Sequence, residues 1–350
     1  MSEGHDVPAT YAAAGVDIEA GDRAVELIKD AVASTSRSGV LGALGGFSGL
    51  FELDTERYAH PVLVSATDGI GTKLEVARLA GRLDTVGIDA VAMCVDDLIC
   101  VGAEPLFFLD YVAVGRVVPE KIAELVGGIA EGCRQAGCAL VGGETAEHGG
   151  VMEDDALDVA GFSVGVLEKG TAWGPERVEA GDVLIGLASP GLRSNGYTLA
   201  RHVLLERAGR QLDDPAWEGA RVTVSDELLR PSVIYAGHVL TAARAVPGAI
   251  HAAAHITGGG LAGNLIRALP EDHKAVVDRS ELAVPEIFNE IQRLGAVSDD
   301  EMGRVFNLGV GMILIVSAGK ADEVLISLRS SGLTAARVGV IEPGSREVIV

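Results

Sequence analysis

The stretch Pro61-Val-Leu-Val-Ser-Ala-Thr-Asp-Gly-Ile-Gly-Thr-Lys73 contains a short apolar strand, a turn relieved by two glycines, and the start of a helix that runs through Leu79. Backbone N–H groups at such a helix start can hold phosphate oxygens. Asp68 at the strand end could hold a magnesium ion, and Lys73 could contact a phosphate. The order Gly-Thr-Lys is not that of a Walker A motif. The local pattern is equally compatible with a tight strand-to-helix turn that carries a surface lysine.

The same alternation of strands and helices continues on both sides and predicts a layered α/β (α+β-like) architecture. In the first half we expect helices at 21–35, 84–101 and 119–136, and strands at 105–114, 138–141 and 158–167. After a linker-like stretch at 170–181 we expect helices at 197–208, 226–246, 261–269, 284–294 and 320–330, and strands at 183–187, 249–255, 274–277, 310–316 and 335–341. The expected division is an N-terminal arm and helix at 1–37, one α/β domain at 38–169 and a second at 170–350.

The composition excludes several classes of partner. The 350-residue chain has a formal net charge of −22, whereas nucleic acids and anionic membranes require a basic surface. No apolar run approaches the length of a membrane span, and residues 1–10 lack the basic start and apolar centre of a signal peptide. The four cysteines form no Cys-x-x-Cys pair and are expected to be reduced core thiols. These features predict a cytoplasmic protein.

Carboxylates recur inside otherwise apolar stretches of the first half, at Asp68, Asp97, Asp110 and Glu144. A buried carboxylate is costly unless it is paired or coordinates a cation. Each residue taken singly is best explained by a helix cap or a local pair. Taken as a set at predicted strand ends, they favour a magnesium site in one cleft, because magnesium prefers carboxylate, water and phosphate oxygens.

Three further glycine-rich segments are candidates for ligand contact. The loop at 42–46 is either a flap over a nucleotide or, more simply, an ordinary connection. In Ser194-Asn-Gly-Tyr-Thr198, Ser194 or Asn195 is best explained as a helix N-cap. The run His255-Ile-Thr-Gly-Gly-Gly260 is entropically expensive and suits a backbone that lies against a phosphate. His255 is as compatible with a structural role as with ligand contact.

Segments typical of one enzyme family occur in order along the chain. They are Tyr11-Ala-Ala-Ala-Gly-Val-Asp-Ile-Glu-Ala-Gly21, Leu44-Gly-Gly-Phe47, Thr67-Asp-Gly-Ile-Gly-Thr-Lys73, Val91-Ala-Met-Cys-Val-Asp-Asp-Leu98, Gly102-Ala-Glu-Pro-Leu-Phe-Phe-Leu-Asp-Tyr111, Val141-Gly-Gly-Glu-Thr-Ala-Glu147, Asp158-Val-Ala-Gly-Phe162, Ser194-Asn-Gly-Tyr197, His255-Ile-Thr-Gly-Gly-Gly260 and Phe306-Asn-Leu-Gly-Val-Gly-Met312. Together they resemble phosphoribosylformylglycinamidine cyclo-ligase, also called aminoimidazole ribonucleotide synthetase, from the first of these segments to the C-terminus.

The resemblance implies a ligase of purine biosynthesis that works with ATP and Mg²⁺. ATP phosphorylates the formyl amide oxygen of formylglycinamidine ribonucleotide, the amidine nitrogen attacks the activated carbon, and phosphate leaves as the imidazole ring closes. The products are aminoimidazole ribonucleotide, ADP and phosphate. The family also implies two α/β domains, with the N-terminal domains meeting in a homodimer.

Residue roles follow from the resemblance alone. It assigns ATP and magnesium to Asp68, Gly69, Gly71, Thr72, Lys73, Asp97 and Glu144, with Asp68, Asp97 and Glu144 as the metal ligands. It places Gly45, Gly46 and Phe47 over the nucleotide. It places Asn195, His255, Thr257, Gly258, Gly259 and Gly260 on the substrate side, and it makes His255, Lys73 and Asp97 the catalytic group.

The chain departs from the family pattern at three places. Relatives often have Asn where this chain has Asp96, and His is common where it has Arg193. The acidic segment at 149–157 replaces a Pro-Gly that many relatives carry after the residue matching Glu147, so that loop is expected to be more mobile and receives no catalytic role. The resemblance explains neither the extra charge at Asp96 nor the arginine at 193.

Two alternatives remain. Formylglycinamidine ribonucleotide synthetase, thiamine monophosphate kinase and selenophosphate synthetase belong to the same superfamily; the last usually has a catalytic Cys or Sec in its N-terminal region, where this chain has no cysteine before Cys94. A non-catalytic relative that acts in hydrogenase maturation is the second alternative. That relative ends in a Cys-terminated tail, whereas this chain ends in Glu347-Val-Ile-Val350.

Overall fold

Two separate sheets organise the chain in the computed structural model, which describes residues 10–11, 15–42 and 45–350. Within these residues no helix is long and apolar enough to cross a membrane. Residues 43–44 of the expected flap and residues 12–14 of the N-terminal segment lie outside the described residues. The mixed α/β architecture with two layered halves that the sequence predicts is confirmed.

The first sheet has four strands in the order β3-β6-β4-β5. Their bounds are β3 Pro61–Gly69, β6 Leu157–Glu168, β4 Glu104–Val114 and β5 Ala139–Glu147. The pair β4 and β5 is parallel and is connected through the helix α4 (Pro119–Ala136), whereas β6 runs antiparallel to both of its neighbours. The helix α4 has Pro119 in its first turn and ends at Gly137, whose φ of 70° provides the left-handed C-cap.

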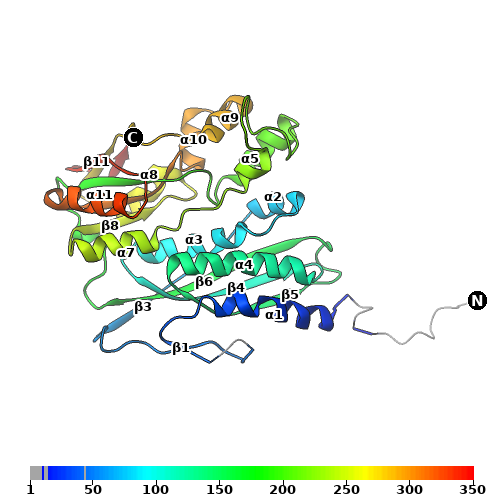
Figure 1. The fold of residues 1–350 in the computed structure, drawn as a ribbon. Helices are drawn as coiled ribbons and strands as arrows, with labels where there is room; N and C mark the ends of the chain where they lie inside the picture. The colour runs from blue at the N-terminus through cyan, green and yellow to red at the C-terminus, as the bar shows by residue number, and fades with distance from the viewer. Residues whose placement is uncertain (1–9, 12–14, 43–44) are drawn as a thin grey trace, which may run out of the picture.

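The helix α3 (Val86–Ile99) is buried on nearly all sides because it lies between the first sheet and the second half of the chain (Figure 1). It contacts β3, β6 and α4 on one side and α7 (Ala236–Ala245) and β8 (Ile250–His255) on the other. The crossing with α4 is close: a Cβ on Gly87 would lie 2.4 Å from the carbonyl oxygen of Leu125. The carboxylates that α3 carries must therefore find partners inside the protein.

The remaining elements of the first half flank this sheet. The helix α1 (Ile18–Ala33) packs on α4 and β5, and its N-cap Asp17 accepts a hydrogen bond from the backbone N–H of Ala20. The short strands β1 (Val40–Leu41) and β2 (Leu50–Phe51) form a hairpin. The helix α2 (Lys73–Ala80) follows β3 directly, as the sequence predicts for the strand–turn–helix stretch.

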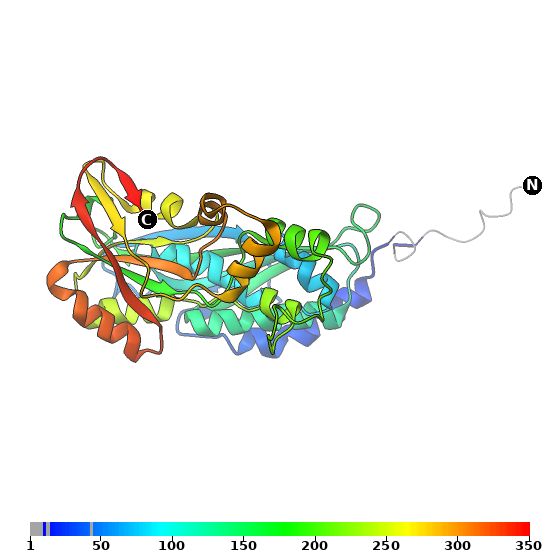
Figure 2. The same ribbon diagram turned by 90° about the horizontal axis from the view of Figure 1, so that it is seen from above.

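The second sheet has six strands in the order β12-β9-β11-β7-β10-β8. The bounds are β7 Val183–Ala188, β8 Ile250–His255, β9 His273–Val277, β10 Val310–Val316, β11 Ala335–Pro343 and β12 Glu347–Ile349. Every residue of β10 is buried, which agrees with its continuous apolar sequence. Seen from above, this half lies over the helices of the first half, with β9, β11 and β12 at one end (Figure 2).

Helices of the second half follow the sequence with two exceptions, the unpredicted α10 and the interrupted helix expected at 226–246. Their bounds are α5 Tyr197–Arg201, α6 Val224–Leu228, α7 Ala236–Ala245, α8 Gly260–Leu265, α9 Glu286–Gly295, α10 Asp299–Val305 and α11 Ala321–Ser330, with a π-helical turn at His202–Arg207 and 3-10 turns at Pro175–Arg177, Ile266–Ala268 and Ala318–Lys320. The single helix expected at 226–246 is wrong. Pro231 interrupts it, because proline lacks the N–H that the helix needs and disfavours a helical residue before it.

One face of the first sheet carries exposed apolar side chains. The side chain of Leu63 is 64% exposed, that of Tyr111 44% and that of Phe162 40%. The register pairs Phe162 with Thr67 and Leu109, which places all three exposed side chains on the face opposite the helix-covered one.

Candidate active site

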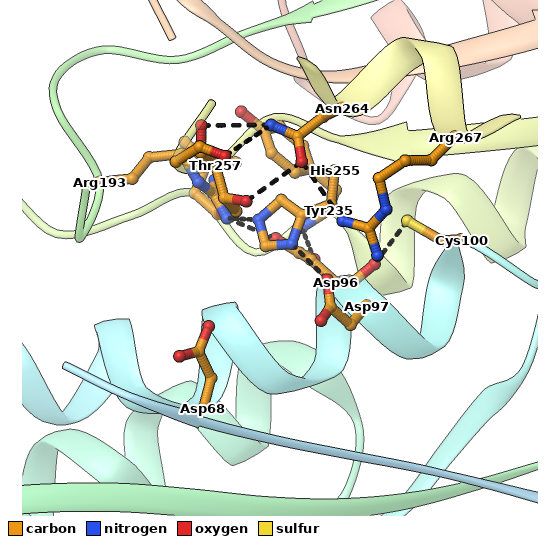
Figure 3. A network of polar contacts seen from close by, with 12 residues as sticks. Asp68, Asp96, Asp97, Cys100, Arg193, Tyr235, His255, Thr257, Asn264 and Arg267 are labelled. Atoms are coloured by element: carbon orange, nitrogen blue, oxygen red, sulfur yellow. Dashed lines mark hydrogen bonds and ion pairs between the residues drawn. The ribbon is translucent and has the colours of Figure 1, made fainter. Parts of the chain in front are cut away.

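A cleft of about 500 Å³ lies between the two halves of the chain. Its walls come from β3, the C-terminal end of α3, the end of β8, and α8 with the turn that follows it. The polar and aromatic residues that line it are Ser65, Thr67, Asp97, Cys100, Trp173, His255, Asn264 and Arg267. Figure 3 shows most of the polar groups from close by.

His255 and Asp97 form the polar centre of this cleft. His255 is the last residue of β8 and is buried, whereas the side chain of Asp97 on α3 is 50% exposed. The His255 Nδ1 atom lies 2.8 Å from Asp97 Oδ1, and its Nε2 atom lies 3.0 Å from Arg193 Nη2. Because a guanidinium only donates, Nε2 accepts and Nδ1 donates its proton to Asp97. One oxygen of the Asp97 carboxylate therefore remains available to a ligand in the cleft.

Asp68 faces the same space from the end of β3. Its Oδ1 atom accepts a hydrogen bond of 2.8 Å from the backbone N–H of Gly69. Partial burial raises the pKa of Asp68 above its usual value, and the negative charge of Asp97 raises it further. Asp68 and Asp97 both lie below His255 in Figure 3. A carboxylate whose ionisation is opposed by a second negative charge nearby suits a divalent cation, which would favour its charged form.

Lys73 does not line the cleft, and its interpretation as a surface lysine is wrong, whereas its contact with a phosphate stays a prediction. Its ammonium is fully buried and lies 2.5 Å from Asp89 Oδ2, whose side chain is also fully buried. It donates further hydrogen bonds to the carbonyl oxygens of Arg193 at 3.1 Å and Arg230 at 2.8 Å. Burial lowers the pKa of Lys73, and the charge of Asp89 opposes this shift. Lys73 is thus not a surface lysine, and it ties α2 to the second half.

The turn before Lys73 stays at the entrance between the halves. Gly71 has a φ of 69°, which a residue with a side chain adopts only under strain. The hydroxyl of Thr72 lies 3.0 Å from the hydroxyl of Thr198 in α5, so these side chains join the two halves. The N-terminus of α2 is not capped by the Thr72 side chain.

Asn195 and the triple glycine lie next to one another. A Cβ on Gly258 would lie 3.9 Å from Asn195 Nδ2. The N-cap interpretation of Ser194 or Asn195 is wrong, because Gly196 with a φ of 79° occupies the N-cap of α5. The buried Ser194 Oγ and Asn195 Oδ1 atoms have no hydrogen-bond partner within the described ranges. Unpartnered buried acceptors are costly, and a bound ligand would satisfy them.

Only part of the triple glycine is left for a ligand. A Cβ on Gly260 would lie 1.8 Å from the carbonyl oxygen of Gly303, and Gly259 has a φ of 98°. The Asn264 amide donates to the carbonyl oxygens of Thr257 and Gly260 at 3.3 and 2.8 Å and so fixes the loop. Gly259 and Gly260 are therefore required by the backbone itself, whereas a Cβ on Gly258 would make only an ordinary contact with Asn195 at 3.9 Å.

Glu144 lies in a second pocket, away from the cleft. This pocket of about 750 Å³ is bounded by α1, β5 and residues 45–49, and it is lined by Gly45, Gly46, Phe47, Asp110 and Glu144. The strands that carry Asp68 and Glu144 are the two edges of the first sheet, three strand spacings or roughly 14 Å apart. That separation is too large for one magnesium ion, whose ligands lie about 2.0–2.1 Å away.

The predicted convergence of four carboxylates is therefore wrong within one chain. Across the part of the chain that the structure describes, no three His, Cys, Asp or Glu side chains are placed to hold one metal ion. Asp110 instead occupies the space above Gly143, where a Cβ would lie 1.7 Å from its Oδ1 atom. Burial raises the pKa of Asp110 to about 7.

Sequence reasoning missed several residues of the site. Asp89 and Tyr235 were not identified because their roles depend on contacts between the two halves. Arg267 is the only lysine or arginine among the residues that line the cleft. Its position in a predicted amphipathic helix gave no signal for ligand contact. A different signal was available: in a chain this acidic, an arginine near a glycine-rich loop is a candidate for an anion contact.

Comparison with known proteins identifies the family of the chain. Residues 55–167 match the model of the N-terminal domain of AIR synthase related proteins, and residues 179–350 match the model of their C-terminal domain. A phosphoribosylformylglycinamidine cyclo-ligase from Anaeromyxobacter dehalogenans is 52% identical over 335 residues, which are 96% of this chain and 96% of that protein. The chain belongs to the phosphoribosylformylglycinamidine cyclo-ligase family. A second relative of that name, from Geotalea daltonii, is 52% identical over 95% of this chain and 94% of that protein.

Solved structures share the fold of this cyclo-ligase family member at low sequence identity. Thiamine-monophosphate kinase from Stenotrophomonas maltophilia superposes with a TM-score of 0.67 at 20% identity, over 93% of this chain and 95% of that one. The hydrogenase maturation protein HypE in complex with ATP superposes with a TM-score of 0.61 at 19% identity, over 91% and 86% of the two chains. Members of both alternative groups thus share the fold with this chain. The identity of 52% to a cyclo-ligase, against 20% and 19% to these two proteins, favours the cyclo-ligase family over both alternatives.

Proposed function

We propose that the cleft between the two halves is where this ligase carries out the reaction of its family. The chain catalyses the ATP-dependent ring closure of formylglycinamidine ribonucleotide to aminoimidazole ribonucleotide, with release of ADP and phosphate, in purine biosynthesis. An amide oxygen is a poor leaving group, so its phosphorylation precedes ring closure. The observation that supports the cleft as the site is the contact of His255 with Asp97 in its wall, with Asp68 near enough for its pKa to respond to both.

Each residue has a distinct task in this proposal. Asp68 and Asp97 present the carboxylate oxygens that would hold Mg²⁺, which supplies charge neutralisation to the phosphates of ATP when it is bound. His255 donates to one oxygen of Asp97 and so fixes the direction of the other. Asn195 and Gly258 border the ribonucleotide, and Arg267 is placed to meet its phosphate. Lys73 and Glu144 are left out of the metal and catalytic group because the first is buried and the second lies across the sheet.

The second pocket completes the proposal. Its volume of about 750 Å³ is suited to a nucleotide. Phe47 is fully exposed at its rim, where the ring is free to stack on a base. We assign Gly45, Gly46 and Phe47 to the adenosine end of ATP, and the cleft to phosphoryl transfer.

We also propose that two copies meet through the exposed face of the first sheet, which carries Leu63, Tyr111 and Phe162. The division of the chain at 38–169 and 170–350 is kept as part of this proposal: the first sheet ends at Glu168 and the second begins at Val183. The cytoplasm is the expected compartment of such an enzyme.

Steady-state kinetics with Asp68→Asn and Asp97→Asn test the cleft. We expect Asp97→Asn to lower kcat about 10²-fold or more, and Asp68→Asn to raise the Mg²⁺ concentration needed for half-maximal rate. Asp22→Asn, at an exposed position of α1, is the matched control and should behave as the parent chain. Phe47→Ala should raise the KM for ATP more than that for the ribonucleotide. Folded Asp68 and Asp97 variants with unchanged kcat and magnesium dependence would place the reaction elsewhere.

A further inference from the structure

Arg193 is held in an unusual position behind the active-site histidine. Its side chain is 1% exposed, and its backbone φ of 64° lies in the left-handed region, which is unfavourable for a residue with a side chain. The guanidinium lies over the ring of Tyr235 at 4.9 Å from the centroid. Its Nη1 atom donates to the carbonyl oxygen of Val233 at 2.7 Å, and its Nη2 atom contacts Asp96 Oδ2 at 2.7 Å and His255 Nε2 at 3.0 Å. Such strain persists only where the surroundings enforce it.

Asp96 holds this arginine in place from the other half of the chain. Its side chain is fully buried on α3, and its second oxygen, Oδ1, accepts a 2.9 Å hydrogen bond from the backbone N–H of Tyr235. Both carboxylate oxygens are thus engaged, and neither faces the cleft. The next residue of the helix, Asp97, points into the cleft. Neighbouring carboxylates on α3 therefore have opposite surroundings, one fully paired inside the protein and one half exposed.

A continuous series of contacts joins the buried pair to the exposed carboxylate. Asp96 contacts Arg193 Nη2, Nη2 contacts His255 Nε2, and His255 Nδ1 contacts Asp97 Oδ1. Arginine has no acceptor, so the contact with Nε2 fixes the direction of both His255 hydrogen bonds. Without Arg193, the histidine ring could flip or change its tautomer and stop donating to Asp97. Figure 3 shows these side chains and their contacts.

We propose that Asp96 and Arg193 act together as a positioning pair that fixes the His255 tautomer and thereby aims the free oxygen of Asp97 into the cleft. This inference rests on the proposed role of Asp97. It also explains the two departures from the family pattern: the residues that differ at positions 96 and 193 contact each other, although they lie 97 positions apart. In this chain the two positions form a buried ion pair.

A purely structural role predicts something different. A buried ion pair is weak evidence for stability, because the cost of desolvating both charges offsets much of the attraction. If the pair served only to hold the halves together, its loss would lower stability and leave the balance between kcat and KM unchanged. If it positions His255, its loss would lower kcat in protein that is still folded. Kinetic and spectroscopic measurements separate these roles.

The test compares Asp96→Asn, Arg193→His and the double variant that carries both exchanges. We expect each single variant to lower kcat about 10-fold or more with little change in the KM for ATP, as is typical when a group that orients an active-site residue is lost. The double variant should recover at least about fivefold over the product of the single effects, the sign of direct coupling. Glu290→Gln is the matched control: it removes a buried carboxylate paired with Arg210 away from the cleft and should leave kcat unchanged.

The hydrogen-bond arrangement is measured directly by ¹⁵N NMR of the histidine rings, with the His255 signals assigned from His255→Gln. In the parent chain we expect the proton on Nδ1, and in Asp96→Asn a change in the ring signature. This readout is independent of catalysis. If the ring signals behave as expected but Asp97→Asn is fully active, the positioning pair is supported and the catalytic role of Asp97 is not. A proton on Nε2 in the parent chain would overturn the inference. So would folded single variants with unchanged kcat, or a double variant no better than the product of the singles.

Discussion

Replacing Lys73 with methionine separates a structural lysine from a phosphate-binding one. The change keeps most of the apolar stem and removes the ammonium that lies 2.5 Å from Asp89 Oδ2. Both side chains are fully buried, so Asp89 would keep its charge without a counterion unless it takes up a proton. Loss of one partner of a buried ion pair costs about 3–5 kcal/mol. The carbonyl oxygens of Arg193 and Arg230 would also lose their donor.

Urea unfolding measures this effect. A loss of about 3–5 kcal/mol corresponds to a fall of about 1 M in the midpoint for a chain with a large unfolding surface. Lys29→Met is the control: its side chain is 51% exposed and its ammonium pairs with Glu26 on the surface, so the expected change is within about 0.5 kcal/mol. Adding Asp89→Asn to Lys73→Met removes the isolated charge and should recover roughly 1–2 kcal/mol.

One outcome would refute the reasoning. If Lys73→Met unfolds at the same urea concentration as the parent chain but loses ATP turnover, the ammonium is not a structural counterion. Lys73 would then leave Asp89 in the working enzyme and contact a phosphate, as the family resemblance first suggested.

Three further outcomes follow from the structure. Gly260→Ala should destabilise the fold by roughly 2–4 kcal/mol, because its Cβ would lie 1.8 Å from the carbonyl oxygen of Gly303. Gly258→Ala should fold and should raise the KM for the ribonucleotide. Equal effects of the two variants in thermal unfolding would contradict this distinction. Burial raises the pKa of Asp110 to about 7 from an unfolded value of 3.8, so the folded state binds the proton more tightly and stability should fall as the pH rises through that window. The parent chain should lose roughly 2–3 kcal/mol of unfolding free energy to this group between about pH 5 and about pH 8, and Asp110→Asn should lack that loss. The same pH profile for both proteins in urea unfolding would count against this prediction. Phe162→Glu should convert the proposed dimer to monomer in light scattering at micromolar concentration, and a persistent dimer would exclude this face of the first sheet.

Local patterns predicted most of the secondary structure. The strand–turn–helix at 61–80 and the buried strand at 310–316 follow from apolar periodicity and glycine placement. The short strands β1, β2 and β12 were missed because two or three residues carry no period. The single helix expected at 226–246 was wrong because the apolar periodicity was given more weight than Pro231, which is visible in the sequence.

The acidic segment at 149–157 makes contacts that its composition did not predict. Its charges and glycines suggested mobility, but the backbone of Glu153 packs against Gly115, where a Cβ would lie 1.8 Å from the Glu153 carbonyl oxygen. The side chain of Asp155 forms an ion pair with Arg78 of α2. The segment is thus attached to the rest of the first half, and no part of the cleft is lined by it.

The sequence by itself determined the family, the reaction, the two-part α/β architecture and the segments from which the site is built, because ordered motifs are a property of the chain alone. Only the tertiary structure decided which of those residues meet. Lys73 turns inward to Asp89, and Glu144 lies at the opposite edge of the sheet from Asp68. Asp96 reaches Arg193 across 97 positions of sequence. Periodicity reports which face of an element is buried, but the partner on that face depends on how two halves pack, and that packing is set by the whole set of contacts between them.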